Sequence, residues 1–249
     1  MKTEWDYTNL AEAYLKRPDY AQSAIDDMLK LAEVEKGDMA CDVGAGAAHL
    51  TLKLAQFGLK VCAVEPNDAM RANGIKRTEE FPDVSWYEGV GEKTGMDSDT
   101  FRLVTFGSSF NVCDRQAALK ESSRILKQGG WFACMWNHRD LEDPLQKRIE
   151  EVLKANIENY DYGTRREDQT EVINASGLFG KVHYLEGTVL HKVASEDFIE
   201  GWKSHGTVYR QSPEKFGAIN AQIRKVVEAE GKEYIEVPYV TRIWMAKKG

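Results

Sequence analysis

The sequence predicts an α/β fold in which a doubly wound, mostly parallel sheet of seven strands carries helices on both faces. Two observations lead to this prediction. Helix and strand patterns alternate along the first half of the chain, and a strand, a glycine turn, a helix and a second strand ending in an acid follow one another between residues 39 and 66. Alternation of this kind needs right-handed crossovers, which place helices on both faces of a parallel sheet.

The elements of the first half are predicted in chain order. Apolar residues at helical spacing before Gly37 predict a helix that covers the sheet. The first two strands lie in MACDV and VCAVEP, with a helix between them that Gly58 closes. Three more strands are expected, at Val84–Tyr87, in FRLVTFG and in GGWFACMW, with a helix containing Ala118 and Ile125 before the last of them.

The second half departs from regular alternation. Pro144 begins a charged helix over about 145–159, and a second helix ends near Gly177. Residues 181–193 and 240–248 are the sixth and seventh strands, with mostly helical chain over 195–230. We predict a single domain, in which residues 1–36 form an N-terminal helical cap, 37–137 a cofactor-binding core, and 138–249 a substrate roof with the last two strands.

The glycine turn predicts half of a nucleoside-binding site. A strand that runs through Gly44 and Gly46 into a helix leaves backbone N–H groups unpaired at the first turn of that helix. Glu65 ends the second strand about 20 residues after the turn, where its carboxylate can accept hydrogen bonds from both hydroxyls of a ribose. In parallel sheets ligands bind at the carboxyl ends of the strands, so we expect Gly44, Gly46, Glu65, Gly91, Ser108 and Asn137 at one rim.

The residues of the glycine turn fit the dinucleotide-binding fingerprint less well than a second nucleoside-binding pattern. His49 occupies the third glycine position of the dinucleotide fingerprint, where a small residue is needed for helix and strand to pack closely. Asp42 instead gives the pattern D-x-G-x-G, which resembles the first motif of class I S-adenosylmethionine (SAM) dependent methyltransferases. Ala48 stands where that family usually has a further glycine.

The resemblance covers about half the chain, from about residue 38 to residue 140, and is greatest to the small-molecule branch of methyltransferase type 11, similar to the quinone-biosynthesis enzymes. Arg124, Leu126, Gly129 and Gly130 match the R-x-L-x-x-G-G turn before the fifth strand. In that Rossmann-like family the loop after strand three meets adenine and the loop after strand four lines the methyl-transfer site. Val90 replaces a common acid, so backbone recognition of adenine is implied at Gly91 and Glu92.

The resemblance and the residue types together imply a set of site residues. The SAM-binding candidates are Tyr14, Arg17, Asp42, Gly44, Ala45, Gly46, Glu65, Pro66, Met70, Gly91, Glu92, Gly107 and Ser108. The substrate-binding candidates are Trp5, Tyr7, Phe110, Asn137, His138, Arg139 and Tyr209. No metal is expected.

Two groups of side chains have more than one interpretation. Arg17, in a Y-x-x-R-P-x-Y segment, is either the guanidinium that grips the carboxylate of SAM or a solvated helix-end cation. His138 and His205 are candidates for a base that deprotonates an oxygen or nitrogen acceptor, or packing residues. The arginines at positions 139, 165, 166 and 210 suit an acidic substrate, but the sequence does not predict which of them face inward.

Composition narrows the class of partner. The net charge of −7 and pI near 5.4 disfavour a nucleic acid, because such partners need a basic surface. No apolar run is long enough to cross a bilayer, and the N-terminus has no secretion signal. The four cysteines show no metal spacing and predict free thiols in a reducing compartment, with Cys113 more suited to packing than to nucleophilic attack. We therefore expect a cytoplasmic monomer or homodimer.

The predicted function is transfer of a methyl group from SAM to an O, N or C atom of a small molecule, without a metal. One alternative is a nicotinamide-dependent oxidoreductase, against which His49 and the lack of a Tyr-x-x-x-Lys pair argue. The other is a SAM-binding protein without catalysis, supported only by Ala48 and by the absence of an unmistakable base. Because methyl transfer depends mainly on holding the reactants in line, the missing base is weak evidence for it.

Overall fold

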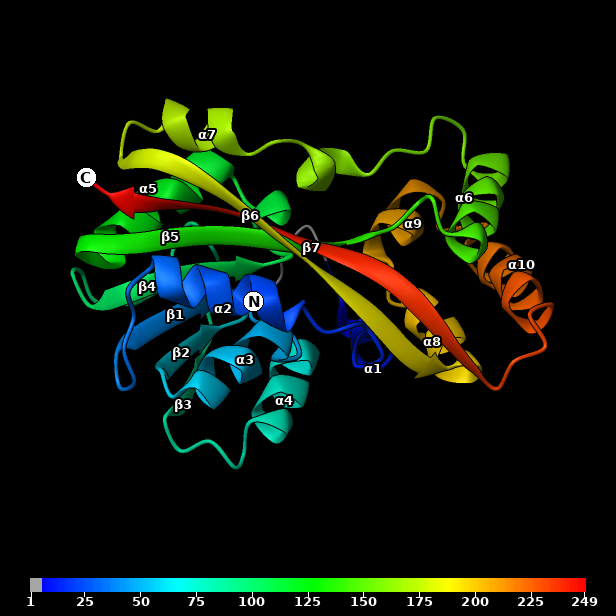
Figure 1. Ribbon diagram of the computed structural model, residues 1–249, viewed down its shortest axis with the longest axis horizontal. Coiled ribbons are helices and arrows are strands. Elements are labelled where there is room, and N and C mark those ends of the chain that lie inside the picture. The colour runs from blue at the N-terminus through cyan, green and yellow to red at the C-terminus, as the bar shows by residue number, and fades with distance from the viewer. Residues whose placement is uncertain (1–5) are drawn as a thin grey trace.

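A computed structural model describes residues 6–249, and in them the predicted α/β architecture is confirmed (Figure 1). One seven-stranded sheet has the order β3-β2-β1-β4-β5-β7-β6. The strands are β1 (Met39–Val43), β2 (Lys60–Val64), β3 (Val84–Tyr87), β4 (Phe101–Gly107), β5 (Leu126–Arg139), β6 (Phe179–Ala194) and β7 (Tyr234–Lys248). The first five are parallel, and β7 is antiparallel to both β5 and β6.

Helices connect the strands and form the roof. They are α1 (Ala11–Tyr14), α2 (Gln22–Leu31), α3 (His49–Phe57), α4 (Asp68–Arg77), α5 (Arg115–Ile125), α6 (Pro144–Asn156), α7 (Thr170–Ala175), α8 (Ser195–Trp202), α9 (Gly206–Gln211) and α10 (Phe216–Glu228). Short 3-10 turns lie at Thr8–Leu10, Phe110–Val112 and Gly163–Arg166. None of the helices in the described part of the chain is long and apolar enough to span a membrane.

Local chemistry sets the helix ends. Asn67, Asp114 and Asp143 precede α4, α5 and α6, and each side chain accepts a hydrogen bond from a backbone N–H of the first turn. These N–H groups have no partner within the helix, so a carboxylate or amide oxygen there stabilises the helix start by about 1 kcal/mol. Gly58 ends α3 with φ of 104°, a left-handed conformation that glycine adopts without steric cost.

The core lies on both faces of the sheet because successive strand residues point in opposite directions. In β1, Ala40 packs in a buried cluster with residues of α2 and α3, whereas Cys41 packs in a second cluster with residues of α5 and α7. The continuous apolar character of β1, β2 and β4 follows from this burial on both faces.

A third apolar cluster joins α6, α8, α9 and α10 to the far ends of β6 and β7 (Figure 1). The two strands extend past the rest of the sheet to reach these helices. The expected range of the seventh strand was wrong at its start: β7 begins at Tyr234 rather than Val240, because its first residues pair with the last residues of β6, Ile235 opposite Val193. The roof is therefore held by the same strands that complete the sheet.

The chain order of the strands reverses beside β1, which pairs with β2 on one side and β4 on the other. Loops leaving neighbouring strands diverge at such a point and open a crevice at the carboxyl ends of the strands. The glycine turn after β1, the acid after β2 and the loop after β4 all border this crevice.

Candidate functional site

The turn between β1 and α3 is built around two glycines in left-handed conformations. Gly44 has φ of 66° and Gly46 φ of 55°. A Cβ on Gly44 would lie 2.4 Å from the Cβ of Ser109, in the loop after β4, so only glycine fits. Ala48, where the resembled family has glycine, also takes a positive φ, 67°. The backbone thus keeps the shape that the motif requires.

Glu65 lies directly after β2 with its carboxylate facing the glycine turn. One oxygen accepts from the backbone N–H of Gly46 at 2.8 Å and the other from the N–H of Asn67 at 2.9 Å. The side chain is only 7% exposed, and burial raises its pKa, while the two backbone hydrogen bonds act in the opposite direction. A carboxylate oxygen has two lone pairs, so each can still accept a hydrogen bond from a ligand hydroxyl.

Asp42 supports the turn from inside the sheet. Its two oxygens accept hydrogen bonds from the hydroxyls of Thr51 (2.7 Å) and Thr105 (2.9 Å), on α3 and β4. Burial raises the pKa of Asp42 to about 6, and the two threonine hydroxyls act to lower it. The carboxylate ties β1 to both of its neighbouring elements, and it also borders the second cavity described below.

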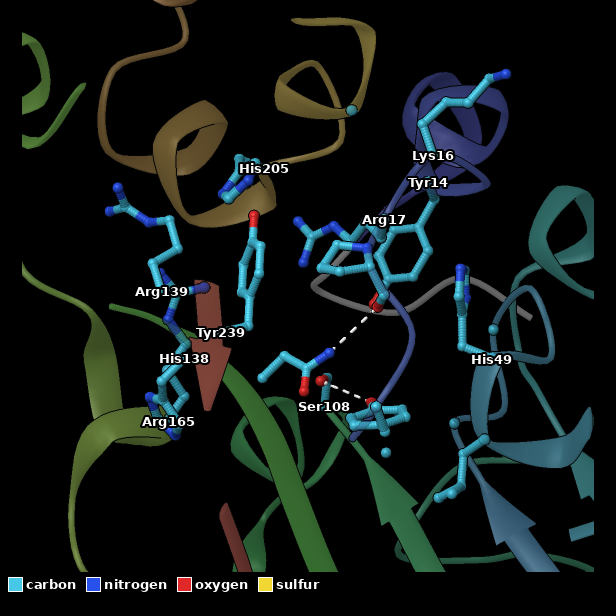
Figure 2. A pocket seen from close by; sticks show the side chains of 18 of the residues that line it. Tyr14, Lys16, Arg17, His49, Ser108, His138, Arg139, Arg165, His205 and Tyr239 are labelled. Carbon is cyan, nitrogen blue, oxygen red and sulfur yellow. Dashed lines mark hydrogen bonds between the residues drawn. The ribbon is translucent and has the colours of Figure 1, made fainter. Parts of the chain in front are cut away.

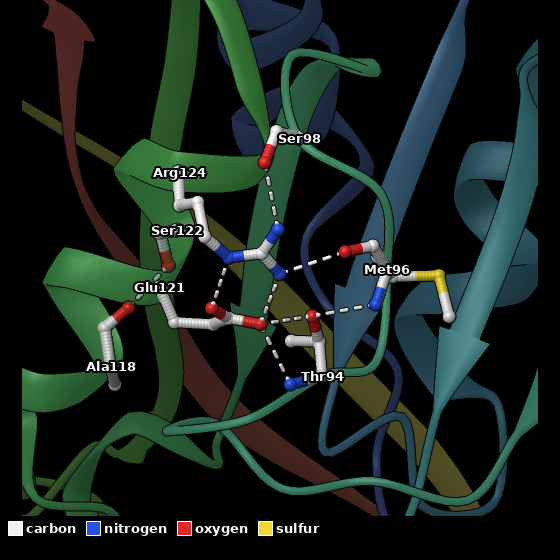
Figure 3. Close-up of polar contacts among 7 residues, drawn as sticks. All are labelled: Thr94, Met96, Ser98, Ala118, Glu121, Ser122 and Arg124. Carbon is white, nitrogen blue, oxygen red and sulfur yellow. Dashed lines mark hydrogen bonds and ion pairs between the residues drawn. The ribbon is translucent and has the colours of Figure 1, made fainter.

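The loop after β3 is held by the arginine of the R-x-L-x-x-G-G turn (Figure 3). Arg124 donates to both oxygens of Glu121 (2.7 and 2.8 Å) and to the carbonyl of Met96 at 2.7 Å. Glu121 also accepts from the N–H and hydroxyl of Thr94. Burial acts to raise the pKa of Glu121, but these hydrogen bonds hold it at about 2. The network fixes the chain on either side of Thr94, and with it the nearby segment at Gly91.

Two adjoining cavities lie over the crevice. The larger has a volume of about 490 Å³ and is bordered by Glu65, Pro66 and Met70 on one side and by the loops after β3 and β4 on the other. A volume in this range is typical of a site for a small molecule or cofactor. The smaller cavity, about 90 Å³, lies between the glycine turn, the N-terminal segment and the roof. The residues that border both are Tyr14, Gly44, Gly46, Gly107 and Ser108.

The structure brings all of the predicted cofactor residues to these cavities. Those that border the larger one are Tyr14, Gly44, Gly46, Glu65, Pro66, Met70, Gly91, Glu92, Gly107 and Ser108. Arg17, Asp42 and Ala45 border the smaller one. Cys113 also borders the larger cavity, but burial raises the pKa of its thiol to about 12, which keeps it from acting as a thiolate nucleophile.

Arg17 reaches into the smaller cavity from the segment after α1 (Figure 2). Its Nε donates to the hydroxyl of Ser204 at 2.8 Å, one Nη donates to the carbonyl of Ser204 at 2.9 Å, and the guanidinium lies over the ring of Tyr14 at 4.6 Å. These contacts leave its other Nη without a hydrogen bond among the described residues. The interpretation of Arg17 as a solvated helix-end cation does not fit this position.

Three histidines border the smaller cavity with a ring nitrogen that has no hydrogen-bond partner among the described residues: Nε2 of His49 and His138 and Nδ1 of His205. Burial, together with the positive charges of Arg166, Arg242 and Arg165, lowers the pKa of His138 to about 3. His205 stacks on Trp202 with ring centroids 4.1 Å apart, and its pKa is also well below the ordinary value, because of burial and then Arg17, Arg139 and Arg165.

The substrate-binding candidates are divided by the structure. Asn137, His138 and Arg139 border the smaller cavity, whereas Tyr7 borders the larger one. His138 was expected just past the fifth strand but lies within β5, which continues to Arg139 because β7 pairs with it that far. Trp5 lies outside the described residues.

Two candidates border neither cavity. Phe110 is completely buried and packs against the rings of Phe106 and Phe132, since the loop after β4 turns it into the core. Tyr209 is 41% exposed and packs against Phe216 on the outside of the roof. The structure therefore does not bring these two residues to the cavities.

Other residues at the cavities lie outside the two sets of SAM-binding and substrate-binding candidates, although Arg165 and Arg166 were among the arginines considered for an acidic substrate. In the N-terminal segment, the hydroxyl of Tyr20 forms a hydrogen bond of 2.9 Å with the hydroxyl of Ser108. The position of Tyr20 in the Y-x-x-R-P-x-Y segment was the sequence feature that could have indicated this role. The roof supplies further aromatic and basic side chains to the smaller cavity, namely Tyr162, Arg165, Arg166, Trp202 and Tyr239. Among residues 6–249 no cluster of three or more histidine, cysteine or acidic side chains is arranged to hold a metal.

Part of the chain is similar in sequence to known methyltransferases. Residues 41–134 match the family model for a methyltransferase domain. Over 128 residues the chain is 31% identical to an uncharacterized methyltransferase of Mycobacterium tuberculosis (strain ATCC 25618 / H37Rv), covering 50% of this chain and 48% of that protein. It is 30% identical over 113 residues to the ubiquinone/menaquinone biosynthesis C-methyltransferase of Zymomonas mobilis, covering 44% of this chain and 47% of that protein. The matches thus span about half the length of these curated relatives.

The fold is also that of solved methyltransferases. The phosphoethanolamine N-methyltransferase 2 of Haemonchus contortus, in complex with S-adenosyl-L-methionine, superposes with a TM-score of 0.57 at 16% identity, covering 99% of this chain and 58% of that one. The matched residues 41–134 include the glycine turn, Glu65 and the loops after β3 and β4. These are the segments that border the larger cavity.

Proposed function

We propose that this chain, which carries a methyltransferase domain of the class I SAM-dependent type at residues 41–134, transfers a methyl group from SAM to a small-molecule acceptor. The observation that carries the proposal is the position of the Glu65 carboxylate beside the glycine turn, at the edge of a cavity of about 490 Å³. A nucleoside needs that combination of a diol acceptor and a close approach to backbone.

The residues around the larger cavity fit the nucleoside of SAM. Glu65 would accept hydrogen bonds from the ribose hydroxyls, and the segment at Gly91 and Glu92 would contact adenine through its backbone. The side chain of Glu92 already accepts from the N–H of Asp114 at 2.6 Å, which supports this backbone role. Arg17, with one Nη unpaired among the described residues, is suited to the carboxylate of the methionine part.

Bound SAM would supply an electrophilic methyl group to an electron pair on an O, N or C atom of the acceptor, with the electrons of the broken carbon–sulfur bond remaining on sulfur. The work of the chain is to hold the acceptor in line with that methyl group and to exclude water. Gly107, Ser108 and Tyr14 border both cavities, so the two reactants would meet beside them. Tyr20 fixes Ser108 through the hydrogen bond between their hydroxyls.

His138 and His205 remain candidates for a base. Their low pKa values keep both imidazoles neutral at physiological pH, so each has a free lone pair, but an imidazole with so low a pKa is a weak base that retains a proton poorly. The low pKa values support a mechanism in which holding the acceptor in line with the methyl group contributes more to the rate than a base does. A base is needed only when the attacking atom of the acceptor carries a proton.

The alternative of a nicotinamide-dependent oxidoreductase is not favoured. His49, 7% exposed, fills the first turn of α3 where the dinucleotide motif has a glycine. A SAM-binding protein without catalysis is also less well supported, because the cavity between the cofactor site and the roof has the position that an acceptor needs.

The proposal also covers the domain organisation, cellular location and oligomeric state of the protein. We propose one domain divided at about residues 36 and 137, working in the cytoplasm on small-molecule metabolism as a monomer or homodimer. Free cysteines and the net charge of −7 support a reducing compartment and a partner other than nucleic acid.

Incubation of the purified protein with methyl-labelled SAM and a small-molecule cell extract tests the proposed function. We expect label in a product that has gained one methyl group, together with an equal amount of S-adenosylhomocysteine. Formation of neither, or oxidation of an extract component that requires a nicotinamide cofactor, would contradict the proposal.

A further inference from the structure

The smaller cavity is strongly basic although the chain as a whole is acidic. Four arginines border it, at positions 17, 139, 165 and 166, while the chain carries a net charge of −7. Asp42 is the acid that borders it among the described residues, and both of its oxygens are taken by threonine hydroxyls. Positive charge concentrated in a concave site on an acidic protein indicates an anionic ligand.

The contacts of these arginines show which of them are available. Arg139 is 7% exposed and forms an ion pair with Glu150 at 2.8 Å, so its charge is largely matched. Arg166 donates one hydrogen bond, to the carbonyl of Arg139, and lies over the ring of Tyr162 at 4.2 Å. Arg165 has no hydrogen bond or acidic partner among the described residues, and its guanidinium lies 5.4 Å from the centre of the Tyr162 ring.

The positive charge of Arg165 is also energetically unfavourable at this position. Burial lowers the pKa of Arg165, and the nearby guanidinium groups of Arg17, Arg139 and Arg166 lower it further, with only Tyr160 acting in the opposite sense. Arg165 is only partly exposed, and a cation held among like charges is unfavourable unless an anion compensates it. No side chain of the described residues supplies that anion, so a bound anionic molecule would stabilise the site.

The carboxylate of SAM cannot compensate all of these charges. In Figure 2, Arg17 and Tyr14 lie to one side of Tyr239, next to the glycine turn, while His138, Arg139 and Arg165 lie to the other side. Arg17 is therefore placed for the cofactor, whereas Arg165 lies on the side of His138 and Arg139. Arg166, the next residue along the chain, also borders this cavity. The unpaired nitrogens of His138 and His205 lie in that same cavity.

We propose that the methyl acceptor is an anion, a small molecule with a carboxylate or phosphate group, and that Arg165 and Arg166 bind this group. The inference rests on the proposed function and adds the class of substrate. Guanidinium groups suit either anion because their planar donors match two of its oxygens at once. The anion also replaces the missing partner of Arg165.

The binding step can be tested without turnover. Inorganic phosphate and succinate are titrated separately into protein saturated with S-adenosylhomocysteine, and the imidazole proton resonances of His138 and His205 are followed against pH. We expect the pKa of both histidines to rise in the presence of at least one anion, because a negative charge at Arg165 offsets the positive charges that lower them. Arg165→Gln should abolish the rise. No rise with either anion, or an equal rise in Arg165→Gln, would overturn the proposal.

The substrate class can be tested by fractionation. A small-molecule extract is separated on an anion-exchange resin at pH 8, and each fraction is assayed with labelled SAM. We expect the acceptor in the retained fraction, with a KM roughly tenfold or more higher in Arg165→Gln and an unchanged Kd for SAM. Arg165→Lys should restore part of the loss, since it keeps the charge.

Controls separate this inference from the proposed function. Arg224→Gln, on the outer face of α10 and paired with Glu196, should leave the KM for the retained fraction unchanged. Label found only in the unretained fraction would overturn the anionic acceptor while supporting methyl transfer. If neither fraction is labelled but the anions still raise the pKa values of His138 and His205, the proposed function is contradicted and the anion site is supported.

Discussion

Glu65→Gln is expected to raise the Kd for SAM by roughly ten- to a hundred-fold, as each charge-assisted hydrogen bond to a ribose hydroxyl contributes about 1.5 to 3 kcal/mol. A carboxamide keeps the shape of the side chain but loses the charge. It also presents an NH2 group to one of the two backbone N–H groups, of Gly46 and Asn67, that the carboxylate now accepts. Calorimetric titration with SAM measures the change.

A matched variant makes this result specific. Glu80→Gln removes an exposed acid beyond α4 and should leave the Kd for SAM unchanged. Thermal unfolding of both variants shows that they are folded. If folded Glu65→Gln binds SAM as tightly as the unchanged protein, Glu65 does not bind the ribose.

Gly44→Ala is expected to reduce both the stability of the protein and its affinity for SAM. The added Cβ would lie 2.4 Å from the Cβ of Ser109, and φ of 66° is strained for any residue with a side chain. Relief requires the glycine turn and the loop after β4 to move apart, and both border the two cavities. We expect the free energy of unfolding to fall by about 2 to 4 kcal/mol and binding of SAM to be lost or greatly weakened.

Two further variants separate steric overlap from backbone strain. Gly37→Ala places a Cβ at φ of 90° with no heavy atom within 4 Å, so it should cost only the strain, about 1 kcal/mol or slightly more, and leave binding intact. In Gly44→Ala with Ser109→Gly the overlapping atoms are gone, and part of the affinity for SAM should return. Denaturant unfolding and calorimetry measure the two quantities. Equal behaviour of Gly44→Ala and Gly37→Ala would show that the contact with Ser109 is unimportant.

The sequence was sufficient to predict the part of the site that local rules control. The glycines of the turn, the acid at the end of β2 and the R-x-L-x-x-G-G turn each have a backbone or hydrogen-bonding reason for their residue type. The structure places Gly44, Glu65 and Arg124 where those reasons require. Short-range geometry and the topology of a parallel sheet were enough to bring them to one rim.

The remaining differences depend on partners distant in the sequence. β5 extends to Arg139 because β7, about a hundred residues later, pairs with it. Phe110 enters the core because Phe106 and Phe132 leave room for its ring, and Tyr209 turns outward onto Phe216. None of these contacts has a local signal.

Arg165 illustrates the same limit at the substrate side. It lies in a polar segment without helical or strand periodicity, so the direction of its side chain could not be predicted. The short 3-10 turn at Gly163–Arg166 and the ring of Tyr162 set its position in the folded chain. Only the tertiary structure distinguishes it from the many arginines that remain in solvent.

We propose that the nucleoside of SAM lies in the larger cavity with its hydroxyls at Glu65. A crystal structure of the protein with S-adenosylhomocysteine would locate the nucleoside. We expect both ribose hydroxyls within about 3 Å of the Glu65 carboxylate and adenine against the chain at Gly91. Density for S-adenosylhomocysteine elsewhere, with this cavity empty, would contradict it.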